Sequence, residues 1–91
     1  MEFEWDTQKA AHNFRKHGID FSEAATVFVD PLSVTYSDPD HSIDEERYII
    51  IGRSNRDRLL IVSHTDRGNL TRIISARTAK RPERKLYESS N

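Results

Sequence analysis

The sequence contains no cysteine, and this absence excludes a disulfide framework and thiolate chemistry. It also lacks a glycine-rich phosphate loop and a serine nucleophile elbow. No apolar run approaches the roughly 20 residues that a membrane-spanning helix needs. The start of the chain has an acid at position 2 and no apolar stretch, so a signal peptide is not expected. We therefore expect one cytoplasmic domain over residues 1–91, with no membrane association.

Charge is distributed unevenly along the chain, although the formal net charge is only −1. Residues 1–52 hold eleven acidic and four basic residues, a sum of −7, whereas residues 53–91 hold four acidic and ten basic residues, a sum of +6. Such asymmetry indicates a nucleic acid or an oppositely charged protein as a partner on one side of the molecule.

The segment from Asp6 to His17 is predicted to form the first helix. Asp6 can accept hydrogen bonds from the free amides at its start, and Gly18 can take the positive φ that ends a helix. Ala10, Phe14 and His17 are spaced at i, i+4 and i+7, so we expect them to share the buried face. A core or capping role is accordingly preferred for His17, with a role as general acid or base as the alternative.

A second helix is predicted from Phe21 to about Val29 and a third from Ala79 to Glu88. Asp20 and Glu23 fit the spacing of a capping box at the start of the second helix. Its end is expected at Asp30-Pro31, because a residue before proline is pushed out of the helical region. Pro82 is tolerable in the third helix because it falls in the first turn.

Four further segments are rich in β-branched and aromatic residues and are predicted to be strands: Leu32–Tyr36, Arg47–Arg53, Arg58–His64 and Leu70–Arg77. The last three are joined by short turns, which implies antiparallel neighbours. Simple alternation places Ile73, Ser75 and Arg77 on one face of the last strand and Arg72 on the other. The predicted fold class is α+β, with an antiparallel sheet of about four strands, two N-terminal helices and one C-terminal helix.

The last strand and the closing helix carry most of the basic charge. Arg77, at the strand end, could donate two parallel hydrogen bonds to a phosphate and stabilise the charge that develops in phosphoryl transfer. The alternative is a solvated arginine paired with an acid from the acidic half. His64 could act as a general acid or base near neutral pH, although a structural role is an open alternative for a histidine at a strand end.

The acidic segment 37–46 has the composition of a metal site but not the pattern. It places Ile43 where a calcium loop needs glycine and Ile49 at the twelfth position, and it offers only one histidine for zinc. We therefore expect no metal and no cofactor. Glu45 could serve as a base, or it could pair with Arg47 or Arg58.

Six short motifs follow one another in the order typical of one protein family. They are Phe3-Glu4-Trp5-Asp6, Lys16-His17-Gly18-Ile19, the pattern from Phe21 to Asp30-Pro31, Asp40-His41-Ser42 with Asp44-Glu45-Glu46-Arg47, Arg58-Leu59-Leu60 with Val62 and His64-Thr65, and Arg72-Ile73-Ile74-Ser75-Ala76-Arg77. The chain resembles the BrnT-type toxins over nearly its whole length.

This resemblance implies a RelE-like fold and the toxin half of a type II toxin–antitoxin pair. It implies a metal-independent ribonuclease that cleaves mRNA by attack of the ribose 2′-hydroxyl on the adjacent phosphate. The implied partner is a BrnA-like antitoxin with a ribbon-helix-helix DNA-binding domain, in a complex that could hold a homodimer of the toxin. The alternative is a catalytically silent module that only pairs with an antitoxin-like transcriptional regulator.

Residue roles can be assigned from the resemblance by position. The catalytic candidates are Arg77, His64, Arg72, Arg58, Glu45 and Tyr87, with the arginines facing phosphate, His64 or Glu45 as the acid or base, and Tyr87 as a stacking or active-site residue. The RNA-binding candidates are Lys16, Lys80, Arg81, Arg84 and Lys85. Direct binding to double-stranded DNA is not expected, because no helix-turn-helix pattern is present.

Overall fold

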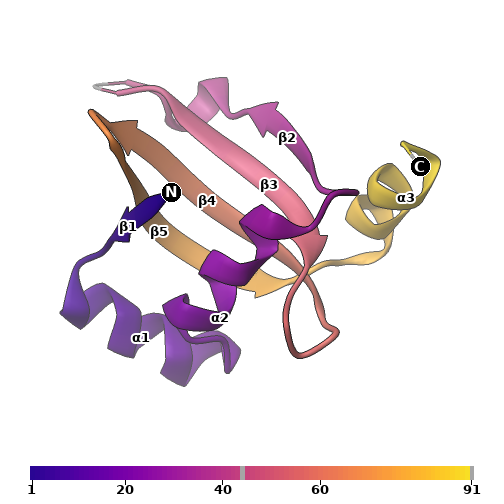
Figure 1. Cartoon of the computed structure of the whole chain (residues 1–91), viewed down its shortest axis with the longest axis horizontal. Coiled ribbons are helices and arrows are strands. Elements are labelled where there is room, and N and C mark those ends of the chain that lie inside the picture. The colour runs from indigo at the N-terminus through magenta and orange to yellow at the C-terminus, as the bar shows by residue number, and fades with distance from the viewer. Residues whose placement is uncertain (44, 91) are drawn as a thin grey trace.

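The computed structural model describes residues 1–43 and 45–90, so Asp44 of the acidic segment and Asn91 lie outside the described residues. A five-stranded sheet with the strand order β1-β5-β4-β3-β2 forms the centre of the molecule (Figure 1). In chain order the elements are β1 (Glu2–Glu4), α1 (Thr7–His17), α2 (Phe21–Thr26), the 3₁₀ turn η1 (Val27–Val29), β2 (Val34–Ser37), the 3₁₀ turn η2 (Pro39–His41), β3 (Arg47–Arg53), β4 (Leu59–Arg67), β5 (Leu70–Thr78) and α3 (Arg81–Ser89). No helix of the described residues is long and apolar enough to cross a membrane.

The α+β class, the three helices and the antiparallel pairing of the last three strands are confirmed, but the number of strands is five rather than four. The extra strand is β1, which pairs in parallel with the start of β5, so the sheet is mixed. Phe3 of β1 packs its ring 5.0 Å from that of Phe28, between ring centroids. The alternation of Phe3 and Trp5 indicates only a short extended entry, and the strand is held in place by its pairing with β5 and by this ring contact.

The predicted caps of α1 and α2 are present. Asp6 accepts hydrogen bonds from the amides of Gln8 and Lys9 at 2.8 and 3.1 Å, and Gly18 has a φ of 72° at the end of α1. Asp20 caps α2 by accepting from the amide of Glu23 at 2.7 Å. The reciprocal half of the capping box is not made by Glu23, whose carboxylate is hydrogen-bonded elsewhere.

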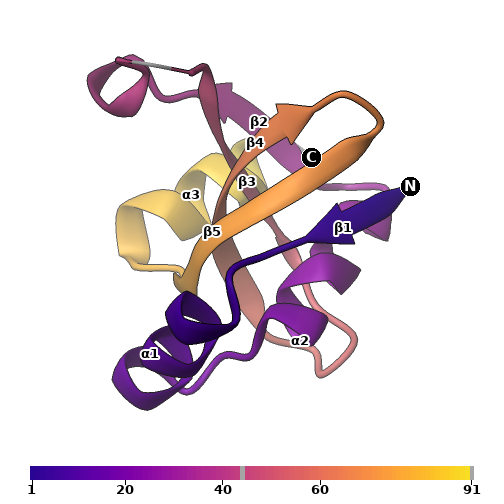
Figure 2. The same cartoon turned by 90° about the vertical axis from the view of Figure 1, so that its left-hand side faces the viewer.

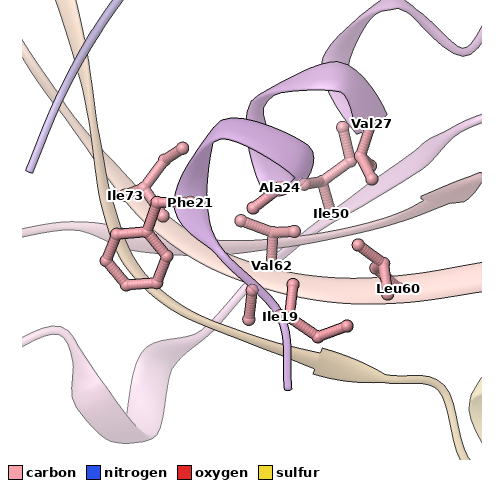
Figure 3. Close-up of a cluster of buried hydrophobic side chains, with 9 residues drawn as sticks. Ile19, Phe21, Ala24, Val27, Ile50, Leu60, Val62 and Ile73 are labelled. Carbon is pink, nitrogen blue, oxygen red and sulfur yellow. The ribbon is translucent and has the colours of Figure 1, made fainter. Parts of the chain in front are cut away.

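Helices α2 and α3 lie on opposite faces of the sheet (Figure 2). Between α2 and the sheet lies the main core: Ile19, Phe21, Ala24 and Val27 pack onto Ile50, Leu60, Val62, Ile73 and Ala76 (Figure 3). Under α3 lies a smaller cluster: Ile51, Leu59, Ile61 and Tyr87. The backbones of η1 and β3 are so close that a Cβ on Gly52 would come within 2.7 Å of Cγ1 of Val27.

Helix α1 docks on the outer edge of β5 through a polar residue. The buried Asn13 amide donates to the carbonyl oxygen of Ala76 at 2.8 Å and to that of Ile19 at 3.0 Å, and its oxygen accepts from the amide of Ala76 at 3.1 Å. Asn13 thus replaces a neighbouring strand for this part of β5. The expected burial of Phe14 and His17 is wrong, because Phe14 is 54% exposed and His17 is exposed.

A β-bulge in β5 changes which of its side chains share a face. Ser75 pairs with Ser63 and Ile73 pairs with His64, so Ile74 has no residue opposite it in β4. Ile73 and Ala76 consequently lie in the same core cluster, and the expectation that Ile73 shares a face with Ser75 and Arg77 is wrong. The same shift brings Arg72 and Arg77 onto one face of the sheet, the face of α3.

Candidate nucleic-acid interface

Arg58 is held by an almost fully buried carboxylate. Its Nε donates to Oε2 of Glu23 at 2.9 Å and its Nη2 to Oε1, while Glu23 has only 2% of its side chain exposed. Ser54 Oγ also donates to Oε2 of Glu23, at 2.7 Å. The hydrogen bonds from Arg58 are the main reason that the pKa of Glu23 lies below its ordinary value. Arg58 therefore ties the β3–β4 turn to α2.

Arg77 is also paired, but its partner comes from the basic half. Its Nη1 donates to Oε1 of Glu83 at 2.8 Å and its Nη2 to Oε2 at 2.5 Å, and Nη1 also donates to the carbonyl of Thr78 at 3.2 Å. These bonds with Glu83 raise the pKa of the guanidinium. The side chain remains 32% exposed, so part of it can be reached from solvent.

Arg72 and Glu45 belong to a looser set of ion pairs at the opposite end of the same face. Arg72 Nη1 lies 3.5 Å from Oε1 of Glu4. Glu45 lies between two arginines, 3.8 Å from Nε of Arg47 and 3.6 Å from Nη2 of Arg67. The pairing with Arg47 confirms one expected alternative, whereas Arg58 is engaged elsewhere. Partly exposed pairs at such distances contribute about 0–1 kcal/mol, so a phosphate could compete for these arginines.

His64 and Tyr87 are both buried. His64 is 6% exposed, with its ring 4.8 Å from that of Phe28 and stacked 5.7 Å from that of Tyr48. Neither ring nitrogen has a hydrogen-bond partner among the described residues, and burial lowers the pKa of the imidazole. The Tyr87 hydroxyl donates to Oδ2 of Asp30 at 2.8 Å. These positions favour the structural alternative for His64 and leave the Tyr87 ring covered.

The five RNA-binding candidates share a different environment. All are exposed, and none is within ion-pair distance of an acid in the part of the chain that the structure describes: Lys16, Lys80, Arg81, Arg84 and Lys85. Four of them lie on or next to α3, which covers one end of the sheet (Figure 1). Lys16 lies on α1, on the other side of Arg77.

A groove of about 420 Å³ runs between α1 and the unpaired edge of β5. Its lining residues are Gln8, Lys9, His12, Asn13, Lys16, His17, Ile74 and Ser75. Sequence reasoning missed Lys9 and His12, and it placed His17 in the core. The spacings 8, 12, 16 and 9, 13, 17 mark one helical face and could have revealed the groove, but of its residues only Lys16 and His17 were considered, and His17 was assigned to the core.

The fold and this surface define a small α+β protein whose unpaired basic groups suit a polyanionic ligand. Residues 5–83 match the family described as ribonuclease toxin, BrnT, of type II toxin–antitoxin system. The chain belongs to this BrnT family of ribonuclease toxins, which confirms the resemblance seen in its motifs and implies an antitoxin partner.

The crystal structure of the Brucella abortus ribonuclease toxin BrnT is similar to the present structure. The two share 25% sequence identity, and the match has a TM-score of 0.70 and covers 89% of this chain and 99% of the Brucella chain. No curated protein has a significant sequence match to the chain.

Proposed function

We propose that the chain is a metal-independent endoribonuclease that cleaves mRNA in the cytoplasm by attack of a ribose 2′-hydroxyl on the adjacent phosphate. Its activity is neutralised by a BrnA-like ribbon-helix-helix antitoxin, in a complex that contains a toxin homodimer, and its fold is a RelE-like variant. Membership of a ribonuclease toxin family and the concentration of exposed, unpaired cations around Arg77 support this proposal.

Within this proposal, Arg77 holds a phosphate and the cations of α3 hold the neighbouring part of the strand. Arg72, together with Glu45, forms a second contact with the RNA, because the bulge in β5 places Arg72 on the same face of the sheet as Arg77. Arg72 and Arg77 are opposite Thr65 and Ile61, four residues apart on β4, or about 13 Å at the usual rise per strand residue. The two arginines would therefore contact different phosphates of one RNA strand.

The three remaining catalytic candidates receive supporting roles. Arg58 joins the β3–β4 turn to α2, His64 fills the space between Phe28 and Tyr48, and Tyr87 anchors α3 to Asp30. Their burial and pairing favour a second candidate function, the silent module that only holds an antitoxin, because they reduce the number of groups available for chemistry.

Incubation of the purified protein with single-stranded RNA in EDTA distinguishes the two functions. The ribonuclease should cleave without metal, and RNA binding should weaken steeply as salt is added, because each neutralised phosphate releases condensed counterions. Arg77→Ala should reduce cleavage, and Arg77→Lys should restore little of it, since lysine keeps the charge but not the two-pronged donor geometry. Intact RNA at high protein concentration would establish the silent module instead.

A further inference from the structure

Helix α1 is unusual in its charge. Over Thr7–His17 it contains five basic or titratable-basic side chains and no acid: Lys9, His12, Arg15, Lys16 and His17. Like charges one turn apart destabilise an isolated helix. Among the described residues, no acid lies within ion-pair distance of these side chains to relieve the repulsion. An anion bound along this helix would offset that cost, and the helix lies in the half of the sequence that is acidic by composition.

Four of these five side chains line the groove between α1 and β5: Lys9, His12, Lys16 and His17. Arg15 is not among the lining residues. No acidic side chain is among them either, so the described walls of the groove are cationic or neutral. On the β5 side the wall is formed by Ile74, the bulge residue, and by the exposed Ser75, which pairs with Ser63 on the face that carries Arg72 and Arg77.

His12 and His17 are separated by five helical residues, which corresponds to about 7.5 Å along the helix axis. Two imidazoles at this spacing, both lining one groove, can flank a bound phosphodiester. The groove residues that face His17 from α1 are His12 and Lys16, and Arg77 is the nearby charge on β5. Partial burial and these three positive charges lower the pKa of His17, which favours its neutral form near pH 7.

We propose that the groove between α1 and β5 holds the scissile phosphodiester of a single-stranded RNA, with His17 as the general base and His12 as the general acid. This assignment rests on the proposed ribonuclease function. Lys9 and Lys16 lie against the non-bridging oxygens, and Arg77 contacts the next phosphate.

The reaction consists of one displacement at phosphorus. The neutral imidazole of His17 takes the proton of the 2′-hydroxyl while the 2′-oxygen forms a bond to phosphorus. The bond between phosphorus and the 5′-oxygen breaks, and the imidazolium of His12 gives its proton to that oxygen. The products are a 2′,3′-cyclic phosphate and a 5′-hydroxyl, and no metal, oxidant or further reactant is consumed.

The test compares His17→Ala, His17→Gln and His12→Ala with Arg15→Ala, a matched change on the same helix outside the groove. Cleavage of single-stranded RNA is followed from pH 5 to 9, and affinity is measured with a 2′-O-methyl version of the same strand, which cannot be cleaved. Each histidine variant should lose about 100-fold or more in cleavage rate, the usual scale of a general acid or base. The affinity and the melting temperature should stay near those of the parent protein.

The pH profile provides a readout that a structural role would not affect. The acidic limb of the rate profile should flatten in the His17 variants, which lack the base. Lys9→Ala combined with Lys16→Ala should weaken binding of the 2′-O-methyl strand by 10-fold or more, and Arg15→Ala should change it little. Histidine variants that cleave at the parental rate while Arg77→Ala is inactive would overturn the groove assignment and leave the ribonuclease function intact. A parent protein that cleaves no RNA would overturn both.

Discussion

Removing Arg58 should reduce the stability of the fold, because the buried carboxylate of Glu23 would lose its charged partner. In Arg58→Ala, Glu23 loses both of its hydrogen bonds from the guanidinium and keeps the one from Ser54. Breaking a buried ion pair costs about 3–5 kcal/mol. Arg58 itself is 37% exposed, and solvent screening weakens such a pair, so we expect a loss at or below the lower limit of that range, about 2–3 kcal/mol. For a chain of this length the melting temperature should fall by about 10–20 °C.

Urea denaturation at pH 7 measures this loss, and a second substitution tests its cause. Glu23→Gln in the Arg58→Ala background removes the buried charge and should recover part of the lost free energy of unfolding. The pKa of Glu23 is lower in the folded protein than its ordinary value of 4.5, so its stabilising contribution is present above about pH 4.5 and is lost as the pH falls below it. This acid sensitivity should decrease in Arg58→Ala. Unchanged stability with a loss of cleavage would refute the structural assignment and return Arg58 to the catalytic site.

Three further predictions concern packing and protonation. Gly52→Ala should lower the free energy of unfolding by about 1–3 kcal/mol in urea titrations, because its Cβ would contact Val27, and full stability would show that η1 can move away. Because burial lowers the pKa of His64 in the folded state, stability should fall as the pH drops below about 6.5; His64→Leu should remove this dependence, and a dependence that persists would assign it to another group. Tyr87→Phe should cost about 1 kcal/mol through loss of the bond to Asp30 and leave RNA cleavage unchanged, whereas a selective loss of cleavage would give Tyr87 a role in the reaction.

The parts of the fold that depend on local signals could be predicted from the sequence. Asp6 and Gly18 define the ends of α1, and the β-branched segments define β3, β4 and β5, because capping and strand composition act within a few residues. The pairing of β1 with β5 could not be predicted, since it depends on contacts between distant segments, among them that of Phe3 with Phe28. The bulge at Ile74 is equally invisible, because pairing with β4 determines it.

Prediction of the candidate interface from the sequence is limited by tertiary contacts in the same way. The exposure of Lys80 and its neighbours follows from the composition of α3, but the pairing of Arg58 with Glu23 joins residues 35 positions apart. The burial of His64 also depends on tertiary contacts, with Phe28 and Tyr48. The groove was missed because Phe14 and His17 were assigned to the buried side of α1, whereas the helix docks through the polar Asn13, with Ala10 packed against the core.

The bulge in β5 has a consequence for how the chain can vary in length. Between Leu70 and Thr78 of β5, only Ile74 has no paired residue in β4. Deleting it would leave Ile73 and Ser75 adjacent and still opposite His64 and Ser63, so both flanks would keep their neighbours and the arginines their face. The deletion would change only the wall that Ile74 gives to the groove beside α1. Loss of this one residue would therefore alter the groove while the core beneath it stays the same.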